Sequence, residues 1–341
     1  MTRHEAVRAE PNPQPDKALL DVVRLQVVFD TPGGHVHAVN GVSFKLRRGE
    51  TLAILGESGC GKSVTMQAIM GLVRSPPGHV RAERIRFGDT DLLNAPSATM
   101  RAMRGAKIAM IFQDPFMSLD PTKTVGQQIG EMFRIHRRAS RGEARRKAIE
   151  LMERVRIPSA ASRVDDYPHQ FSGGMSQRVM IAAAIALDPE VLIADEPTTA
   201  LDVTVQAQIM ELLSELQREL GMAMVLITHD VGLAAEHAER AAVMYGGLIV
   251  ETGPMRALQR DPRHPYTIGL LHSIPDIDRR VGRLQPIPGT PPVLSAAPTA
   301  CSFRPRCAWA RTRCGDELPP LREVAPGRFA ACHFAEEVHG E

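Results

Sequence analysis

A glycine-rich segment at residues 56–63, Gly-Glu-Ser-Gly-Cys-Gly-Lys-Ser, has the residue types and the spacing of a phosphate-binding loop. An apolar run at residues 52–55 precedes it and a helical pattern follows it, which is the context that such a loop needs. Its glycines allow a tight turn whose backbone N–H groups point at an anion. Lys62 is then expected to reach the β- and γ-phosphates of a nucleotide, and the Ser63 hydroxyl to ligate Mg²⁺. An ordinary glycine-rich turn before a helix is the alternative.

A pair of carboxylates ends a second apolar run. Residues 191–194 are Val-Leu-Ile-Ala, and Asp195 and Glu196 follow them directly. In a phosphate-loop protein, the first acid suits the magnesium shell and the second can orient or deprotonate a water molecule. A strand that ends in Asp-Glu is common by itself. Together with residues 56–63, it makes nucleoside triphosphate hydrolysis the leading hypothesis.

Three further polar sites could take part, and each also has an ordinary structural explanation. Residues 171–178, Phe-Ser-Gly-Gly-Met-Ser-Gln-Arg, could present N–H groups to an anion or simply cap the helix that follows. His229 follows an apolar run, where a histidine is more often structural than catalytic. Gln113 follows another apolar run and could be no more than a polar residue at a strand end.

The elements that must position these residues alternate between strands and helices. Period-2 patterns and short apolar runs predict strands, and 3.6-residue patterns predict helices. The predicted strands are residues 22–29, 36–46, 84–87, 108–112, 191–194, 223–227, 241–244 and 247–250, and the helices include 203–220 and 231–237. This alternation is typical of an α/β fold with a mostly parallel sheet and helices on its faces.

The remaining stretches divide the chain. Residues 1–17 carry charges and prolines and are expected to be a disordered tail. The first two strands predict an antiparallel β subdomain before the phosphate loop, and the helical pattern predicts a helical subdomain at about residues 115–187. Proline-rich sequence beyond Gly253 predicts a boundary near residue 255. We therefore expect a nucleotide-binding domain at residues 18–255 and a small loop-rich domain at 256–341.

The overall charge gives no reason to expect a nucleic-acid partner, because 41 Lys and Arg residues nearly balance 39 Asp and Glu residues. No apolar run approaches the ~20 residues that span a bilayer, so a membrane role would depend on partner proteins. Basic residues between positions 134 and 147 are interpreted as a solvated helix–loop–helix surface, with contact to lipid headgroups as the alternative.

Taken in order, these segments resemble the ATP-binding cassette (ABC) family over about residues 22–252. Residues 56–63 resemble its Walker A motif, residues 172–177 its signature motif, and Gln113 the glutamine of its Q-loop. Asp195 matches the Walker B aspartate and Glu196 the catalytic glutamate. Asp202 matches the aspartate of the D-loop, and His229 matches the switch histidine.

The resemblance implies a role for each of these positions. It assigns magnesium to Ser63, Gln113 and Asp195, and catalysis to Glu196, His229 and Gln113. Two such domains resemble a head-to-tail sandwich, in which the ATP of one faces the signature residues of the other, here Ser172, Gly173, Gly174 and Gln177. The residues implied to contact ATP in the same domain are Phe29, Gly56, Glu57, Ser58, Gly59, Cys60, Gly61, Lys62, Ser63 and Val64. For Phe29, which would stack on adenine, a plain core position is the alternative.

Further sequence segments resemble, within this family, the ATP-binding subunits of bacterial oligopeptide, dipeptide and nickel importers. The matching segments are residues 111–121, 195–202, 264–267, 273–275 and 287–292 and the cysteine-rich tail. This resemblance implies a peripheral ATPase at the cytoplasmic face of the bacterial inner membrane. Its implied partners are a second ATPase subunit, with a paralogue favoured, two integral membrane permease subunits and an extracytoplasmic solute-binding protein. Transport of nickel or another small solute is one alternative, and a soluble ABC ATPase without a transport role is another.

Four of the five cysteines lie close together in the tail, at Cys301, Cys307, Cys314 and Cys332. A cytosolic setting, as the cassette resemblance implies, favours a bound metal over disulfides. The spacing alone leaves zinc and an iron–sulfur cluster equally open. The importer resemblance implies a [4Fe–4S] cluster, with Zn²⁺ as the alternative. The fifth, Cys60, stands where a serine is usual, and its place before a helix predicts a lowered pKa and a reactive thiol.

Overall fold

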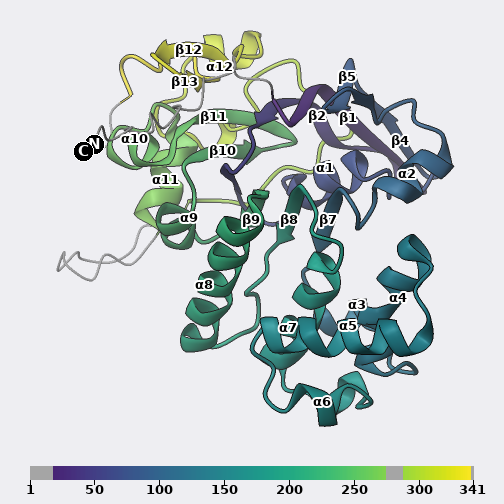
Figure 1. The fold of residues 1–341 in the computed structure, drawn as a ribbon. Coiled ribbons are helices and arrows are strands. Elements are labelled where there is room, and N and C mark those ends of the chain that lie inside the picture. Colours follow the sequence, from purple (N-terminus) through teal and green to yellow (C-terminus); the bar gives the residue numbers. More distant parts are fainter. Residues whose placement is uncertain (1–17, 274–286, 339–341) are drawn as a thin grey trace, which may run out of the picture.

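The computed structural model describes residues 18–273 and 287–338. The predicted disordered tail at residues 1–17 lies outside the described residues, and so does most of the 273–275 segment. The described chain folds around two sheets, a helical part beside them and a C-terminal region against the edge of the larger sheet (Figure 1).

The larger sheet carries the phosphate loop. Its strand order is β12-β13-β11-β10-β3-β9-β8-β7. Five neighbouring strands, from β10 to β7, are parallel, and the other three are antiparallel. The sheet is therefore mixed, although the strands that hold the predicted chemistry are parallel. The strands are β3 (Thr51–Leu55), β7 (Ile108–Ile111), β8 (Val191–Asp195), β9 (Ala223–Thr228), β10 (Arg240–Tyr245), β11 (Leu248–Pro254), β12 (Arg322–Ala325) and β13 (Arg328–Ala330).

The smaller sheet is antiparallel, as predicted. Its order is β2-β1-β5-β6, and β4 also pairs with β1. Apolar residues of β1 and β2 are buried against α1 and the larger sheet in one core cluster. The strands are β1 (Leu20–Thr31), β2 (Gly34–Leu46), β4 (Gly78–Arg81), β5 (Arg84–Phe87) and β6 (Thr90–Asp91).

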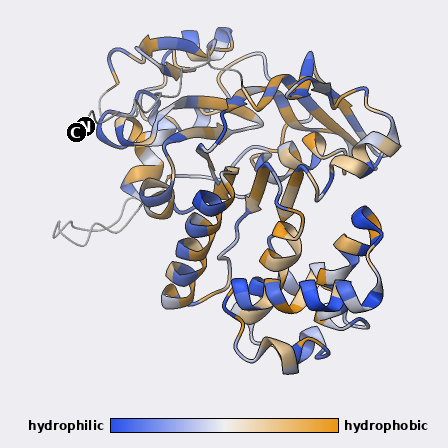
Figure 2. Cartoon of the chain, viewed as in Figure 1, coloured by the Kyte–Doolittle hydropathy of each residue, from blue (hydrophilic) through white to orange (hydrophobic). Residues whose placement is uncertain are grey.

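The helices flank the larger sheet and form the predicted helical part. Fully buried central strands need apolar helix faces on both sides, which explains the apolar runs in the sequence. In Figure 2 the central strands are coloured hydrophobic, whereas α5, on the outside of the helical part, is largely hydrophilic. The helices are α1 (Lys62–Ile69), α2 (Ser97–Met103), α3 (Pro115–Ser118), α4 (Val125–Arg137), α5 (Arg141–Arg154), α6 (Ala160–Arg163), α7 (Gly173–Ile185), α8 (Val203–Leu220) and α9 (Val231–His237), with a 3₁₀ turn η1 (Pro168–Gln170).

Side-chain caps define where several of these helices begin. Thr124 accepts the backbone N–H of Gln127, whose side chain in turn accepts the N–H of Thr124, so α4 starts with a capping box. Ser140 caps α5 in the simpler way, through the N–H of Glu143. The basic cluster at residues 134–147 thus falls on the end of α4 and the start of α5, the predicted helix–loop–helix.

The C-terminal region continues the larger sheet. It contains α10 (Met255–Arg260), α11 (Pro265–His272), η2 (Arg304–Arg306), α12 (Arg313–Asp316), β12 and β13. Strand β13 pairs with β11, so the sheet of the phosphate loop extends into this region. The rings of Tyr245, Tyr266 and Phe303 pack together with centroids 4.6–5.4 Å apart, in a core cluster that the sheet and this region share.

Candidate active site

The phosphate loop connects β3 to α1 in a backbone shape that only glycine permits at key positions. Gly61 has φ +102°, and a Cβ atom there would lie 2.4 Å from the carbonyl oxygen of Ala38. At Gly56, a Cβ atom would lie 2.4 Å from the carbonyl oxygen of Met244. The neighbouring backbone therefore leaves no room for a side chain at either position.

The charged and polar ends of this loop are already held in place. Lys62 is 4% exposed, and its Nζ donates to the carbonyl oxygens of Gly56 (2.8 Å) and Glu57 (3.0 Å). The Ser63 hydroxyl donates to Asp195 Oδ1 at 2.9 Å. Burial raises the pKa of Asp195, against the opposing effect of the Ser63 hydrogen bond. Since β3 and β8 lie on either side of β9 and end at the same edge, their final residues form one site, as the sequence predicts.

Glu196 lies beside this pair as the centre of a hydrogen-bonded cluster. Its Oε2 accepts from Gln113 Nε2 at 3.0 Å and from the Thr199 hydroxyl at 2.9 Å, and His229 Nδ1 lies 3.4 Å away. The structure thus brings together the three residues that the sequence predicts to be catalytic. Glu196 has φ +45°, a left-handed conformation that is unfavourable for a residue with a side chain and that clusters at functional sites. Thr199 was not predicted as a site residue, because residues 195–202 gave only a resemblance to the importers and no separate signal for this threonine.

The signature residues form a second group, next to the D-loop. Ser172 is exposed at the start of α7 and does not cap its own helix. Gly174 packs so closely on α8 that a Cβ atom there would lie 2.8 Å from Val205 Cγ1. Asp202 caps α8 by accepting the backbone N–H of Val205 at 3.0 Å. The two segments that the family places opposite a second domain are therefore neighbours within this chain.

Gln177 differs from its predicted place on the signature surface. It is 2% exposed, because it faces inward on α7 one turn after the glycines, and its Nε2 has no hydrogen-bond partner. In this conformation the surface beside the D-loop offers Ser172, Gly173 and Gly174, but not the Gln177 side chain.

Phe29 lies on β1 in a position that fits both of its predicted roles. It is partly buried, packs against the core of the smaller sheet and pairs with Val36 and Gly78. The exposed part of the ring is the part available to a base.

The expectation of a reactive Cys60 is wrong. Its side chain is 3% exposed, and burial raises the pKa of the thiol, outweighing the nearby Lys62 ammonium. A raised pKa leaves little thiolate near neutral pH, and the thiolate is the reactive form.

The four tail cysteines converge on one small cavity of about 20 Å³. All four are free thiols. Burial raises the pKa values of the Cys301, Cys307 and Cys332 thiols, the last two to about 11, and nearby backbone N–H groups at Phe303, Trp309 and Phe334 oppose this rise. The donor set fits a soft metal or cluster. Within residues 18–273 and 287–338, however, no three His, Cys, Asp or Glu side chains are arranged so that they could hold a metal ion.

The fold and the site define an ABC-type ATPase. The sequence profile described as "ABC transporter" matches residues 39–199. A second profile, "Oligopeptide/dipeptide transporter, C-terminal region", matches residues 250–314.

Curated relatives match nearly the whole chain. The dipeptide transport ATP-binding protein DppD of Escherichia coli (strain K12) is 50% identical over 317 residues, which are 93% of this chain and 97% of the relative. The oligopeptide transport ATP-binding protein OppD of Bacillus subtilis (strain 168) is 50% identical over 312 residues, 91% of this chain and 87% of the relative. The chain belongs to the ABC transporter family, in the group of ATP-binding proteins with this oligopeptide/dipeptide transporter C-terminal region.

A solved structure supports the same fold. The cassette MJ0796, in a dimeric post-hydrolysis state bound to ADP and Pi, is 27% identical, with a TM-score of 0.60. The match covers 70% of this chain and 99% of that cassette. Within the described part of the chain, no helix is long and apolar enough to cross a membrane.

Proposed function

We propose that this chain is the ATP-hydrolysing subunit of an importer of dipeptides or oligopeptides. The observation that carries the proposal is the meeting of Glu196, Gln113 and His229 beside the Ser63–Asp195 pair, at the edge of the sheet that holds the phosphate loop. The match of residues 250–314 to the peptide transporter C-terminal region supports the choice of solute. Nickel or another small solute, and a soluble ABC ATPase, are the alternatives.

The geometry supports a division of labour between the side chains. Lys62, held by two loop carbonyls, can turn its ammonium to the β- and γ-phosphates without leaving the loop. Magnesium, bound through Ser63, Asp195 and Gln113, would offset the phosphate charge. Glu196 polarises the attacking water, and His229 contacts the γ-phosphate. Catalysis is then mainly positioning and charge stabilisation.

The site would be complete only when a second ATPase subunit adds its signature face. Ser172 and the first N–H groups of α7 are available there, and a helix N-terminus favours an anion such as a γ-phosphate. The partner subunit is proposed to be a paralogue. ATP between the two subunits would hold them together until hydrolysis releases them.

Three apolar side chains beside Gln113 support a membrane partner. Phe112, Phe116 and Met117 are 40%, 59% and 85% exposed, although large apolar side chains are usually buried. We assign this surface to one of two integral permease subunits, which receive solute from an extracytoplasmic binding protein. The chain would then be peripheral, at the cytoplasmic face of the bacterial inner membrane.

The tail cysteines are proposed to hold a [4Fe–4S] cluster, with Zn²⁺ as the alternative. Cys301, Cys307, Cys314 and Cys332 would be its ligands, and the backbone N–H groups at three of the sulfurs would stabilise the thiolates. Binding must displace protons from these thiols, and burial raises the pKa values of three of them, Cys301, Cys307 and Cys332. We propose that the chain has two domains, residues 18–255 and residues 256–341. The first includes a helical subdomain at about residues 115–187, and the second holds the four cysteines.

The proposed function is tested with Glu196→Gln. An amide keeps the size of the side chain but cannot take the proton of the water. The variant should bind ATP as the wild type does, and steady-state hydrolysis by the assembled transporter should fall at least a hundredfold. Hydrolysis at the wild-type rate would refute the assignment of Glu196.

Isolation of the tagged chain from membranes tests the transport role. Co-purification of integral permease subunits supports it. Ribosomal or DNA-associated partners in their place would contradict it.

A further inference from the structure

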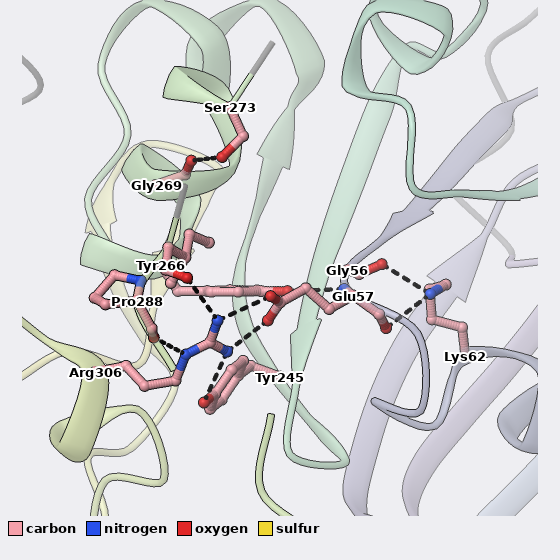
Figure 3. A network of polar contacts seen from close by, with 10 residues as sticks. Gly56, Glu57, Lys62, Tyr245, Tyr266, Gly269, Ser273, Pro288 and Arg306 are labelled. Atoms are coloured by element: carbon pink, nitrogen blue, oxygen red, sulfur yellow. Dashed lines mark hydrogen bonds and ion pairs between the residues drawn. The ribbon is translucent and has the colours of Figure 1, made fainter. Parts of the chain in front are cut away.

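The phosphate loop contains an acidic residue, Glu57, whose carboxylate is bound by an arginine from the far end of the chain. Arg306 Nη1 donates to Glu57 Oε2 at 2.6 Å, and Arg306 Nη2 donates to Glu57 Oε1 at 2.9 Å. The two side chains are 5% and 25% exposed. This is a bidentate, largely buried ion pair, the strong form of such a contact. Figure 3 shows the guanidinium between Glu57 and the C-terminal region.

Other residues fix the position of the Arg306 side chain. Its Nε donates to the carbonyl oxygen of Pro288 at 2.7 Å, and its guanidinium lies over the ring of Tyr245, 5.7 Å from the ring centroid. Arg306 itself ends the 3₁₀ turn η2, directly before Cys307. Because the guanidinium is held on several sides, it presents a fixed fork to the loop instead of a mobile surface charge.

A second contact from the same region binds the backbone of the same loop residue. The backbone N–H of Glu57 donates to the hydroxyl of Tyr266 at 2.8 Å, and Tyr266 is fully buried. The carbonyl oxygen of Glu57 accepts from Lys62 Nζ, so one chain of contacts runs from the C-terminal region to the phosphate-binding lysine (Figure 3).

The charge balance shows why this contact matters for a nucleotide. The loop must hold a triphosphate with several negative charges, and Glu57 places another negative charge in that loop. An unpaired carboxylate there would repel the phosphates, and a partly buried site screens the repulsion less than bulk water does. Arg306 offsets that charge and also fixes the direction in which the loop residue points.

We propose that Arg306 is a positioning residue of the ATP site, which neutralises Glu57 and holds the phosphate loop in its binding shape. This inference rests on the proposed function, since it concerns the same nucleotide site. It assigns the C-terminal region a direct part in nucleotide affinity.

The test measures MgATP binding to the purified chain by titration calorimetry, with four variants. Arg306→Met removes the charge and keeps the length of the side chain, whereas Arg306→Lys keeps the charge and loses the bidentate fork. Glu57→Gln removes the carboxylate, and the fourth variant combines Glu57→Gln with Arg306→Met. Arg313→Met is the control, because it removes an exposed ion pair of the same region, with Glu317, that involves no residue of the phosphate loop.

We expect Arg306→Met to weaken MgATP binding about tenfold or more, Arg306→Lys to weaken it less, and Arg313→Met to leave it within twofold. In the Glu57→Gln background, Arg306→Met should change the affinity less than twofold, because no carboxylate is left to neutralise. In the assembled transporter, Arg306→Met should raise KM for ATP more than it lowers kcat, since Glu196 and His229 are untouched.

The outcomes separate this inference from the proposed function. If the wild type does not bind MgATP, the proposed function fails, and the inference with it. If the wild type binds and Arg306→Met binds equally well, the inference alone is wrong. An equal loss of affinity from Arg306→Met in both backgrounds would also overturn it, because Arg306 would then act on the fold and not through Glu57. If Arg306→Met does not fold, Arg306→Lys in the two backgrounds tests the bidentate contact instead, and an equal loss of affinity in both backgrounds would again overturn the inference.

Discussion

Glu196 owes its position to three neighbours from three different segments. Gln113 follows β7, His229 follows β9, and Thr199 comes from the turn after β8. A carboxylate held by several hydrogen bonds keeps one direction, which is what a base that must face a water molecule needs. We therefore propose that Thr199 orients Glu196.

Thr199→Val tests this role. Loss of the hydroxyl removes one hydrogen bond to the carboxylate, so the side chain should leave its productive position more often. We expect kcat of the assembled transporter to fall about tenfold, equivalent to ~1.4 kcal/mol, with ATP affinity unchanged. Thr122→Val is the matched control, because its hydroxyl donates to Asp120 outside the site. Equal losses of kcat in both variants would show that the Thr199 hydroxyl has no specific role in orienting Glu196.

His264 makes the folded protein sensitive to acid. It is 2% exposed at the start of α11, its Nδ1 accepts the backbone N–H of Tyr266, and burial lowers its pKa from 6.5 to about 3. Between these two values the unfolded chain binds a proton that the folded chain does not. Stability is therefore lost as pH falls through this range, and the loss at pH 5 is about 2 kcal/mol.

His264→Asn should reduce this acid sensitivity, because asparagine can cap α11 without binding a proton. The drop in Tm between pH 7.5 and pH 5 should be smaller in the variant than in the wild type. Glu251 accepts the backbone N–H of His264 and is present in both proteins, so its own titration cancels in the comparison. His272→Asn, at the exposed end of the same helix, is the control. An unchanged drop in the His264→Asn variant would contradict the prediction.

At the scale of elements, the sequence predicts best where periodicity is strong. Helices 203–220 and 231–237 have the predicted bounds, and the strands at the site agree within about two residues, except that β11 extends four residues further. The apolar periodicity of these elements follows directly from which of their faces is buried, so it can be read from the sequence alone. The short strands β12 and β13 were not predicted, because they carry little pattern of their own and join the sheet only where β13 pairs with β11, more than seventy residues away in the chain. The burial of Gln177 and Cys60 was missed for a similar reason, since packing from distant segments decides it.

Helix α3 follows Gln113 and presents apolar side chains to solvent. Its N-cap Asp114 accepts the backbone N–H of Phe116, so the helix begins at Pro115, two residues after Gln113. A partner that binds α3 can therefore respond to movement at Gln113.

Met117→Asp tests whether α3 contacts the permease. The substitution adds a charge to a side chain that is 85% exposed, so it should not disturb the fold. We expect solute uptake in cells to fall about tenfold or more, and ATP binding by the isolated chain to stay within twofold. Val293→Asp, which changes a similarly exposed apolar side chain (81%) in another part of the chain, is the control. Full uptake by the Met117→Asp variant would place the contact elsewhere.

At the scale of the whole molecule, the C-terminal region is an integral part of the structure around the site. Its strands extend the larger sheet, its aromatic rings share a core with β10, and its residues contact the phosphate loop. The sequence pointed to the segments that contain Tyr266 and Arg306, because both segments resemble the importers. It could not show that both reach Glu57, because the two contacts span 209 and 249 positions.

Cys332→Ser tests the proposed cluster. Loss of one of four thiolate ligands should lower the bound iron to less than half of the wild-type content and weaken the visible absorption of an anaerobically purified chain. Zinc in place of iron in the wild type would favour the alternative metal. No metal in the wild type would contradict both.

The separation between Glu57 and Arg306 also has a consequence for synthesis of the protein. A ribosome adds about 5–20 residues per second, so between roughly ten seconds and one minute passes after Glu57 is made before Arg306 exists. During this interval β3 and α1 are present, but the acidic side chain in their loop still lacks its counter-charge. A nascent chain would therefore hold nucleotide weakly, and full affinity would arise only after the segment that contains Arg306 has been made. An unfinished ATPase would in this way consume little ATP before it reaches its partners.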